Sequence, residues 1–167
     1  MGHADNPLEG IEVTGPVRAE VFMVWLNRDR IEIAGPDGAR AWIVQLDEVE
    51  HPVEAVDRIV RGLIGAPLLV HSTSWRRDGA AVILSFVVVI GPGRVAGWES
   101  APVGRAELAR SAATRAPNAI GTGQVLEHGL RHLAWLAQDD SVVRDRLSPA
   151  WKVALAGYVP EPFQGFA

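Results

Sequence analysis

Three side chains that could bind a ligand follow one another closely in the chain. His71, Trp75 and Arg76 lie on or near one predicted hairpin strand, where alternate residues share a face and could line a cleft with an aromatic floor and a guanidinium. A guanidinium binds carboxylates and phosphates through two parallel hydrogen bonds. With Glu50 added from the preceding acidic stretch, we predict a site for a small anionic or nucleotide ligand.

The same cleft could instead catalyse a hydrolysis. An enzyme of this kind would use His71 and Arg76 with the carboxylates of Glu48 and Glu50, because a general acid or base needs only one such group with a suitable pKa. No nucleophile-elbow sequence accompanies these residues. A hydrolase is therefore the alternative interpretation. An ordinary half-exposed strand with no binding or catalytic role also explains most of the same residues.

Two histidines farther along the chain are spaced for a metal ion. His128 and His132 are one helical turn apart, so their imidazoles could share a metal. Glu127 precedes the first histidine instead of following it, so the His-Glu-x-x-His arrangement is absent and a third ligand is not placed. We favour the polar edge of an amphipathic helix here, and we predict no metal site and no cofactor.

The composition narrows the range of functions. The 167 residues carry a formal net charge of −4 and no cysteine, which excludes disulfides and thiolate chemistry. No basic cluster is present for nucleic acid, and the most apolar run, residues 80–90, is too short to cross a membrane. We expect a soluble, cytoplasmic protein that binds neither nucleic acid nor membranes and that could form a homodimer.

Hydrophobic patterning predicts strands first and helices later. Apolar, β-branched runs indicate strands at residues 21–26, 31–34 and 41–46, and two more at 68–75 and 80–90 that an Asp-Gly step would join as a hairpin. Helical periodicity indicates helices at residues 105–114, 123–137 and 141–147, with a short one within 149–158. This order of elements is typical of an α+β or α/β sandwich, and we predict the α+β class.

One amphipathic helix is predicted between the third and fourth strands. Pro52 suits its first turn, its apolar residues recur at the spacing of one buried face, and Gly65 is expected to end it in the left-handed conformation. The exposed face is expected to carry two ion pairs one turn apart, Glu54 with Arg58 and Asp57 with Arg61.

Three residues around this helix keep the spacing of a known motif. Glu50, Arg58 and Gly65 fall where the Nudix box, G-x5-E-x7-R-E-U-x-E-E-x-G-U, has its first Glu, its Arg and its last Gly. The segment therefore resembles the Nudix hydrolase superfamily, and the order of the flanking strands extends the resemblance to residues 20–91. The resemblance implies an α/β/α sandwich with a mixed sheet.

The same frame also departs from the Nudix box at the positions that matter for catalysis. Val44 replaces the first Gly, and Ile59, Gly62 and Leu63 replace the remaining Glu residues. In Nudix enzymes those glutamates hold Mg²⁺ or Mn²⁺ against a diphosphate, and neither an aliphatic side chain nor glycine supplies an oxygen ligand. We therefore predict a catalytically inactive Nudix-like domain over residues 1–100, with a C-terminal helical extension over 101–167 packed on it. Its predicted role is that of a ligand-binding or protein-interaction module.

Overall fold

A mixed six-stranded sheet lies at the centre of the computed structural model, which describes residues 15–93, 97–106 and 121–160. The elements follow one another as β1 (Val17–Asn27), β2 (Arg30–Ala34), β3 (Trp42–Gln45), α1 (Pro52–Ile64), β4 (Leu69–Asp78), β5 (Ala81–Val89), β6 (Ser100–Pro102), α2 (Thr122–Asp139), α3 (Ser141–Arg146) and α4 (Pro149–Leu155). None of the described helices is both long and apolar enough to cross a lipid bilayer.

The long strand β1 organises the sheet. The strand order is β4-β5-β1-β2-β6, and β1 pairs in parallel with β5 and antiparallel with β2 and β3. The first half of β1 pairs with β3 and its second half with β2, which requires a strand of eleven residues. The mixed sheet confirms the fold class predicted from the sequence.

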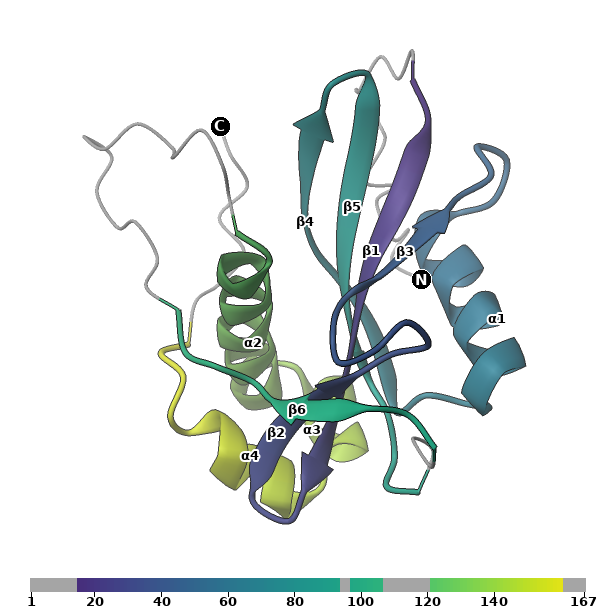
Figure 1. The fold of residues 1–167 in the computed structure, drawn as a ribbon. Helices are drawn as coiled ribbons and strands as arrows, with labels where there is room; N and C mark the ends of the chain where they lie inside the picture. The colour runs from purple at the N-terminus through teal and green to yellow at the C-terminus, as the bar shows by residue number, and fades with distance from the viewer. Residues whose placement is uncertain (1–14, 94–96, 107–120, 161–167) are drawn as a thin grey trace, which may run out of the picture.

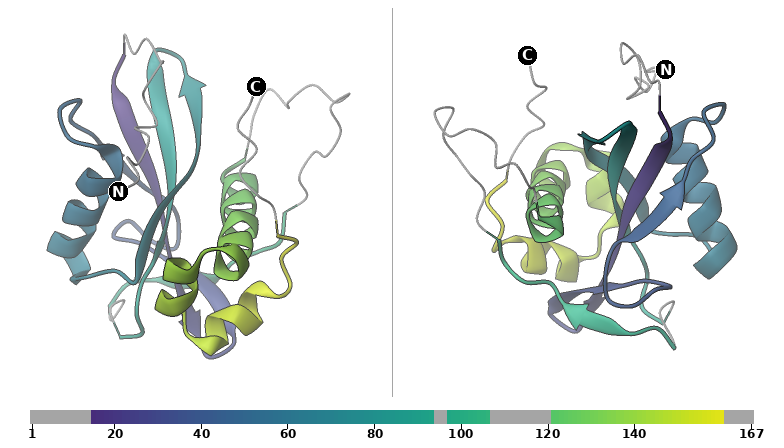
Figure 2. Two further views of the ribbon diagram at one scale, coloured as in Figure 1. Left: turned by 180° about the vertical axis from the view of Figure 1, so that it is seen from behind. Right: turned by 45° about the horizontal axis from the view of Figure 1, so that its top comes forward.

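Helices cover both faces of this sheet, so the molecule has three layers (Figures 1 and 2). Helix α1 lies on one face, and α2 packs on the other face with α3 and α4 beside it. Alternate residues of β1 supply the two cores: Val21 and Met23 pack with α1, whereas Phe22 and Val24 pack with the C-terminal helices. Strand β5 is buried over its whole length because it contributes to both cores.

Helix α1 begins as the sequence predicts and ends differently. Pro52 occupies its first turn, and the Nδ1 atom of His51 accepts a hydrogen bond from the Val53 N–H at 3.3 Å. Gly65 has a φ of 82° and a ψ of −169°, so it is neither left-handed helical nor extended, and its conformation is one that essentially only glycine adopts. Its N–H still donates to the carbonyl of Arg61 at 3.0 Å, which closes the last turn.

Other differences concern strand ends and short elements. Strand β1 starts at Val17, earlier than predicted, and β6 is an additional strand in a Gly- and Pro-rich stretch, where it pairs with β2. The hairpin turn consists of Gly79 and Ala80, with Gly79 at a φ of 59°, because Asp78 still pairs with Ala81.

The C-terminal part of the chain contains the predicted helices where it is described. The helices at 123–137 and 141–147 and the short helix within 149–158 correspond to α2, α3 and α4. The helix predicted at residues 105–114 falls largely outside the described residues. The division into a domain over 1–100 and an extension over 101–167 stays a prediction.

Candidate ligand-binding site

The two charged residues that match the Nudix box form an ion pair. Arg58 donates from Nε to Oε1 of Glu50 at 3.1 Å and from Nη2 to Oε2 at 2.7 Å. The hydrogen bonds from Arg58 hold the pKa of Glu50 below its ordinary value. This pair joins the loop before α1 to the exposed face of the helix. Arg58 therefore pairs with Glu50 and not, as predicted, with Glu54.

The positions that depart from the Nudix box present no oxygen ligand. Ile59 is half-buried, Gly62 is exposed and Leu63 is 44% exposed, so all three lie on or near the surface of α1. Within the described ranges no three histidine or carboxylate side chains come close enough to share a metal ion.

A β-bulge in β4 decides which predicted site residues share a face. The register between β4 and β5 shifts between Ser72 and Ser74, so His71 pairs with Val87 and Arg76 with Ile83. Without the extra residue, His71 and Arg76 would point to opposite faces, because five positions separate them. The bulge turns both toward the face that α2 covers.

The four predicted ligand residues do not gather in one place. Trp75 pairs with Leu84, whose side chain belongs to the core under α1, so it lies on the opposite face from His71 and Arg76 and is 46% exposed. Glu50 precedes α1 on that same opposite side. The sheet therefore separates the imidazole and the guanidinium from the indole and the carboxylate.

The guanidinium of Arg76 binds a carboxylate within the protein. It donates from Nη1 to Oε2 of Glu20 at 2.7 Å and from Nη2 to Oε1 at 3.1 Å. Ser85 Oγ completes the network at 3.3 Å from Nη1 and 3.2 Å from Oε2 of Glu20. The side chain of Glu20 is only 2% exposed, so Arg76 supplies the compensating charge that this buried carboxylate needs.

The imidazole of His71 contacts helix α2. Its Nε2 atom lies 3.2 Å from Nδ1 of His132, and the His132 ring stacks on Trp135. Burial, followed by the neighbouring His132, lowers the pKa of His71 to about 4, although Asp140 acts in the opposite sense. The pKa of His132 is lowered too, by burial and then by His128. This histidine pair is therefore uncharged at neutral pH and joins α2 to the sheet.

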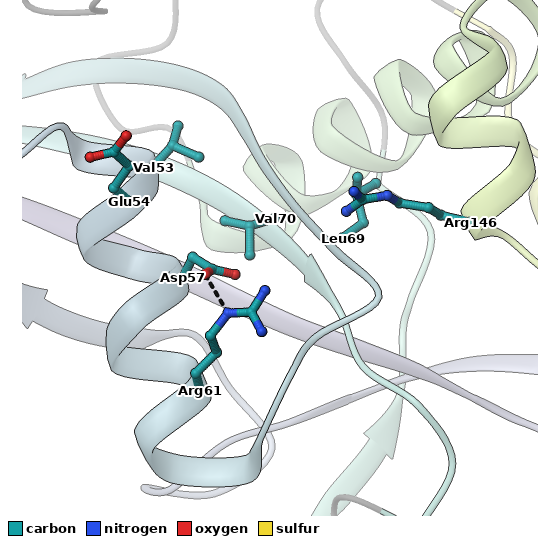
Figure 3. A pocket seen from close by; sticks show the side chains of 7 residues that line it. All are labelled: Val53, Glu54, Asp57, Arg61, Leu69, Val70 and Arg146. Atoms are coloured by element: carbon teal, nitrogen blue, oxygen red, sulfur yellow. Dashed lines mark hydrogen bonds and ion pairs between the residues drawn. The ribbon is translucent and has the colours of Figure 1, made fainter.

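A cavity of about 340 Å³ lies elsewhere, between α1, the start of β4 and the end of α3 (Figure 3). Its apolar lining is Val53 from α1 and Leu69 and Val70 from β4. No residue that matches or replaces a Nudix box position, and none of the four predicted ligand residues, lines it.

Charged side chains of both signs line the same cavity. Asp57 accepts a hydrogen bond from Nε of Arg61 at 2.5 Å, which confirms the second predicted ion pair. Glu54 on α1 and Arg146 on α3 also line the cavity, and within the described residues neither forms an ion pair or a hydrogen bond through its side chain. The contribution of Arg146 is not detectable in the sequence, because it depends on how α3 meets the edge of the sheet.

A second cavity, of about 300 Å³, lies beside the first turn of α2. Thr122 and Gly123 contribute to it, as do Arg40 and Arg105. Arg105 is bound to Glu127 through two hydrogen bonds of 3.1 and 3.0 Å and stacks over the Tyr158 ring. The residues that follow Ala106 lie outside the described part of the chain, so we assign no ligand to this cavity.

The structure resembles a solved protein. The crystal structure of Shewanella oneidensis NrtR, a Nudix-family regulator, matches with a TM-score of 0.56 and 13% sequence identity, over 90% of this chain and 80% of NrtR. Neither a protein family nor a curated protein matches the sequence itself. At this level of identity the likeness shows the fold alone, which is a Nudix-like arrangement of a mixed sheet and helices.

Proposed function

We propose that this chain is a Nudix-like module that binds a ligand or a partner and does not hydrolyse diphosphate bonds. The observation that carries the proposal is the surface of α1, where Ile59, Gly62 and Leu63 stand at the positions of metal-binding glutamates. A hard cation such as Mg²⁺ needs several oxygen ligands, and the carboxylate of Glu50 is already bound by Arg58. The likeness to a Nudix-family regulator supports a binding role, although a fold does not determine function.

The alternative, a hydrolase built around His71, Arg76, Glu48 and Glu50, receives no support from the geometry. His71 and Arg76 face α2 and are engaged by His132 and Glu20, whereas the two glutamates precede α1 beyond the sheet. A general acid and its partner must lie within hydrogen-bond reach of one substrate. Self-association and a cytoplasmic location stay predictions.

Enzyme assays with Mg²⁺ or Mn²⁺ and nucleoside diphosphate derivatives test the proposal. We expect no turnover above that of the Glu50→Gln variant, because a metal cluster is needed for this chemistry. Turnover by the wild-type protein that Glu50→Gln abolishes would contradict the proposal.

A gain-of-function variant sharpens this test. The triple change Ile59→Glu, Gly62→Glu and Leu63→Glu restores the carboxylates of the box, and a Cβ atom at Gly62 meets no atom within 4 Å. We expect the variant to bind Mn²⁺ in a calorimetric titration at least tenfold more tightly than the wild type. Equal binding by the two proteins would show that the missing carboxylates do not explain the lack of a metal site.

A further inference from the structure

We propose that the cavity between α1, β4 and α3 binds a short aliphatic peptide with free ends, of about the size of a dipeptide. This inference rests on the proposed function, since it names the ligand class of a binding module. None of the fixed positions of the Nudix box lines the cavity, although four lining residues, Val53, Glu54, Asp57 and Arg61, come from the same helix.

The charges around the cavity favour a zwitterion. Two carboxylates and two guanidinium groups line it, so its formal charge is zero, and a simple anion would meet repulsion from Glu54 and Asp57. Because Asp57 and Arg61 neutralise each other, the groups left to bind a ligand are the carboxylate of Glu54 and the guanidinium of Arg146. An ammonium group of the ligand would pair with the carboxylate of Glu54, and a carboxylate of the ligand would pair with the guanidinium of Arg146.

The arrangement of these two groups favours a ligand with separated charges. Figure 3 shows Glu54 and Arg146 at opposite ends of the lining, with Val53 beside Glu54, Leu69 beside Arg146 and Val70 between the two charged residues. An aliphatic dipeptide has an ammonium at one end, a carboxylate at the other and apolar side chains between. Arginine binds a carboxylate with two parallel hydrogen bonds, which suits the C-terminal group.

The lining and size of the cavity argue against a nucleotide. No aromatic side chain lines it, and bases are commonly held by stacking on aromatic rings. A volume of about 340 Å³ is near the lower end of the range for ligand sites, roughly 300–1,000 Å³.

The position at the sheet edge favours an extended backbone. Strand β4 is the last strand of the sheet on its side and pairs only with β5 among the described strands. An edge strand offers backbone donors and acceptors on its outer side, and peptides often bind by adding a strand there. Leu69 and Val70, at the start of β4, belong to the cavity lining.

Calorimetric titration with the dipeptide Leu-Val tests the proposal. We expect binding by the wild-type protein, and at least tenfold weaker binding by Arg146→Gln and by Glu54→Gln. The matched controls are Arg77→Gln and Glu99→Gln, which remove exposed charges outside the cavity and should leave binding unchanged. Because the four side chains are exposed, we expect circular dichroism melting curves to show that all four variants fold.

Blocked peptides assign each end of the ligand to its partner. Amidation of the peptide C-terminus should weaken binding to the wild type, and Arg146→Gln should then cause no further loss of affinity. N-acetylation should also weaken binding to the wild type, and Glu54→Gln should then cause no further loss. Absence of Leu-Val binding, or equal loss in the control variants, would overturn the inference. If the protein also fails to hydrolyse nucleoside diphosphate derivatives, the proposed function stands; turnover that Glu50→Gln abolishes would overturn that proposal separately.

Discussion

The two faces of the sheet differ in whether their charged side chains are exposed or buried. Under α1 the core is aliphatic and aromatic, and the ion pairs of the helix, such as Glu50 with Arg58, lie in solvent. Under α2 the structure buries charged and polar side chains, among them Glu20, Glu127 and His132. Among the described residues Glu32, which accepts a hydrogen bond from Ser100 on the edge strand β6, is the buried carboxylate that lies outside this pattern.

This difference shows where ligand chemistry is available. The charges on the α2 face already have protein partners at hydrogen-bond distance, so they hold the fold together and offer little to a ligand. The α1 face is covered by a single helix, which leaves polar groups such as Glu54 at the surface beside a cavity. A charged residue that looks functional in the sequence can thus be structural, and one that looks like ordinary helix surface can line a cavity.

The largest expected contrast between the two faces is that between Glu20→Gln and Glu50→Gln. Loss of the Glu20 carboxylate leaves the guanidinium of Arg76 without its buried counter-charge, and breaking such a pair costs about 3 kcal/mol in the free energy of unfolding. Loss of Glu50 breaks an exposed pair, which contributes little to stability because water and salt screen it.

Urea denaturation of the two variants measures this contrast. The shift of the midpoint reports the change in stability if the slope with urea is unchanged. Similar midpoints for Glu20→Gln and Glu50→Gln would show that the two faces do not differ in the way that their burial indicates. A Glu20→Gln, Arg76→Gln double variant that regains part of the lost stability would identify the unpaired guanidinium as the cause.

The second contrast is a dependence on pH that originates on the α2 face. The pKa of His71 is about 4 in the folded protein against an ordinary value of 6.5, so the unfolded chain binds the proton more readily. Stability should therefore be complete above about pH 6.5 and fall by about 2 to 3 kcal/mol as the pH decreases toward 4. Carboxyl groups with a lowered pKa, such as Glu32, lose their contribution only below their ordinary value of 4.5.

Unfolding experiments across this range, with wild type and His71→Gln, separate the contributions. The variant should show a flatter profile between about pH 6.5 and 5.5, which lies above the ordinary carboxyl pKa of 4.5. A nuclear magnetic resonance titration that finds His71 protonated at its ordinary pKa would refute the expectation, as would identical profiles for the two proteins.

Local patterns were sufficient to predict the parts of the fold that depend on neighbouring residues. Helix α1 follows from apolar residues at helical spacing and from Pro52 in the first turn, and the β4–β5 hairpin follows from two apolar runs around a Gly-containing turn. The helices after residue 120 follow from the same periodicity. Each of these signals acts within about one turn or one strand pair.

Contacts between distant residues could not be predicted in this way. Arg76 meets Glu20 across 56 positions, and the bulge that brings it to the α2 face leaves no recognisable signal around Thr73. Glu54 was expected to pair with Arg58, but the loop before α1 brings Glu50 to Arg58 instead. The side chain of Glu54 therefore lines the cavity without an ion pair to Arg58. The residues of the predicted ligand site therefore lie on two sides of the sheet, although their types are suitable for binding.

The smallest expected contrast compares two glycines, one in the helix on each face. A Cβ atom at Gly129 of α2 would lie 2.6 Å from Cγ2 of Val87 and 3.3 Å from Cγ2 of Thr73, so this glycine lets the helix approach β4 and β5 closely. Gly129→Ala should destabilise the protein by about 1 to 2 kcal/mol, because the overpacking exceeds the gain in helix propensity. Gly62→Ala on α1 meets no atom within 4 Å and should instead stabilise by about 0.5 to 1 kcal/mol. Thermal and urea unfolding of the two variants should thus shift in opposite directions, and a shift in the same direction would mean that α2 sits farther from the sheet than its contacts with Val87 and Thr73 indicate.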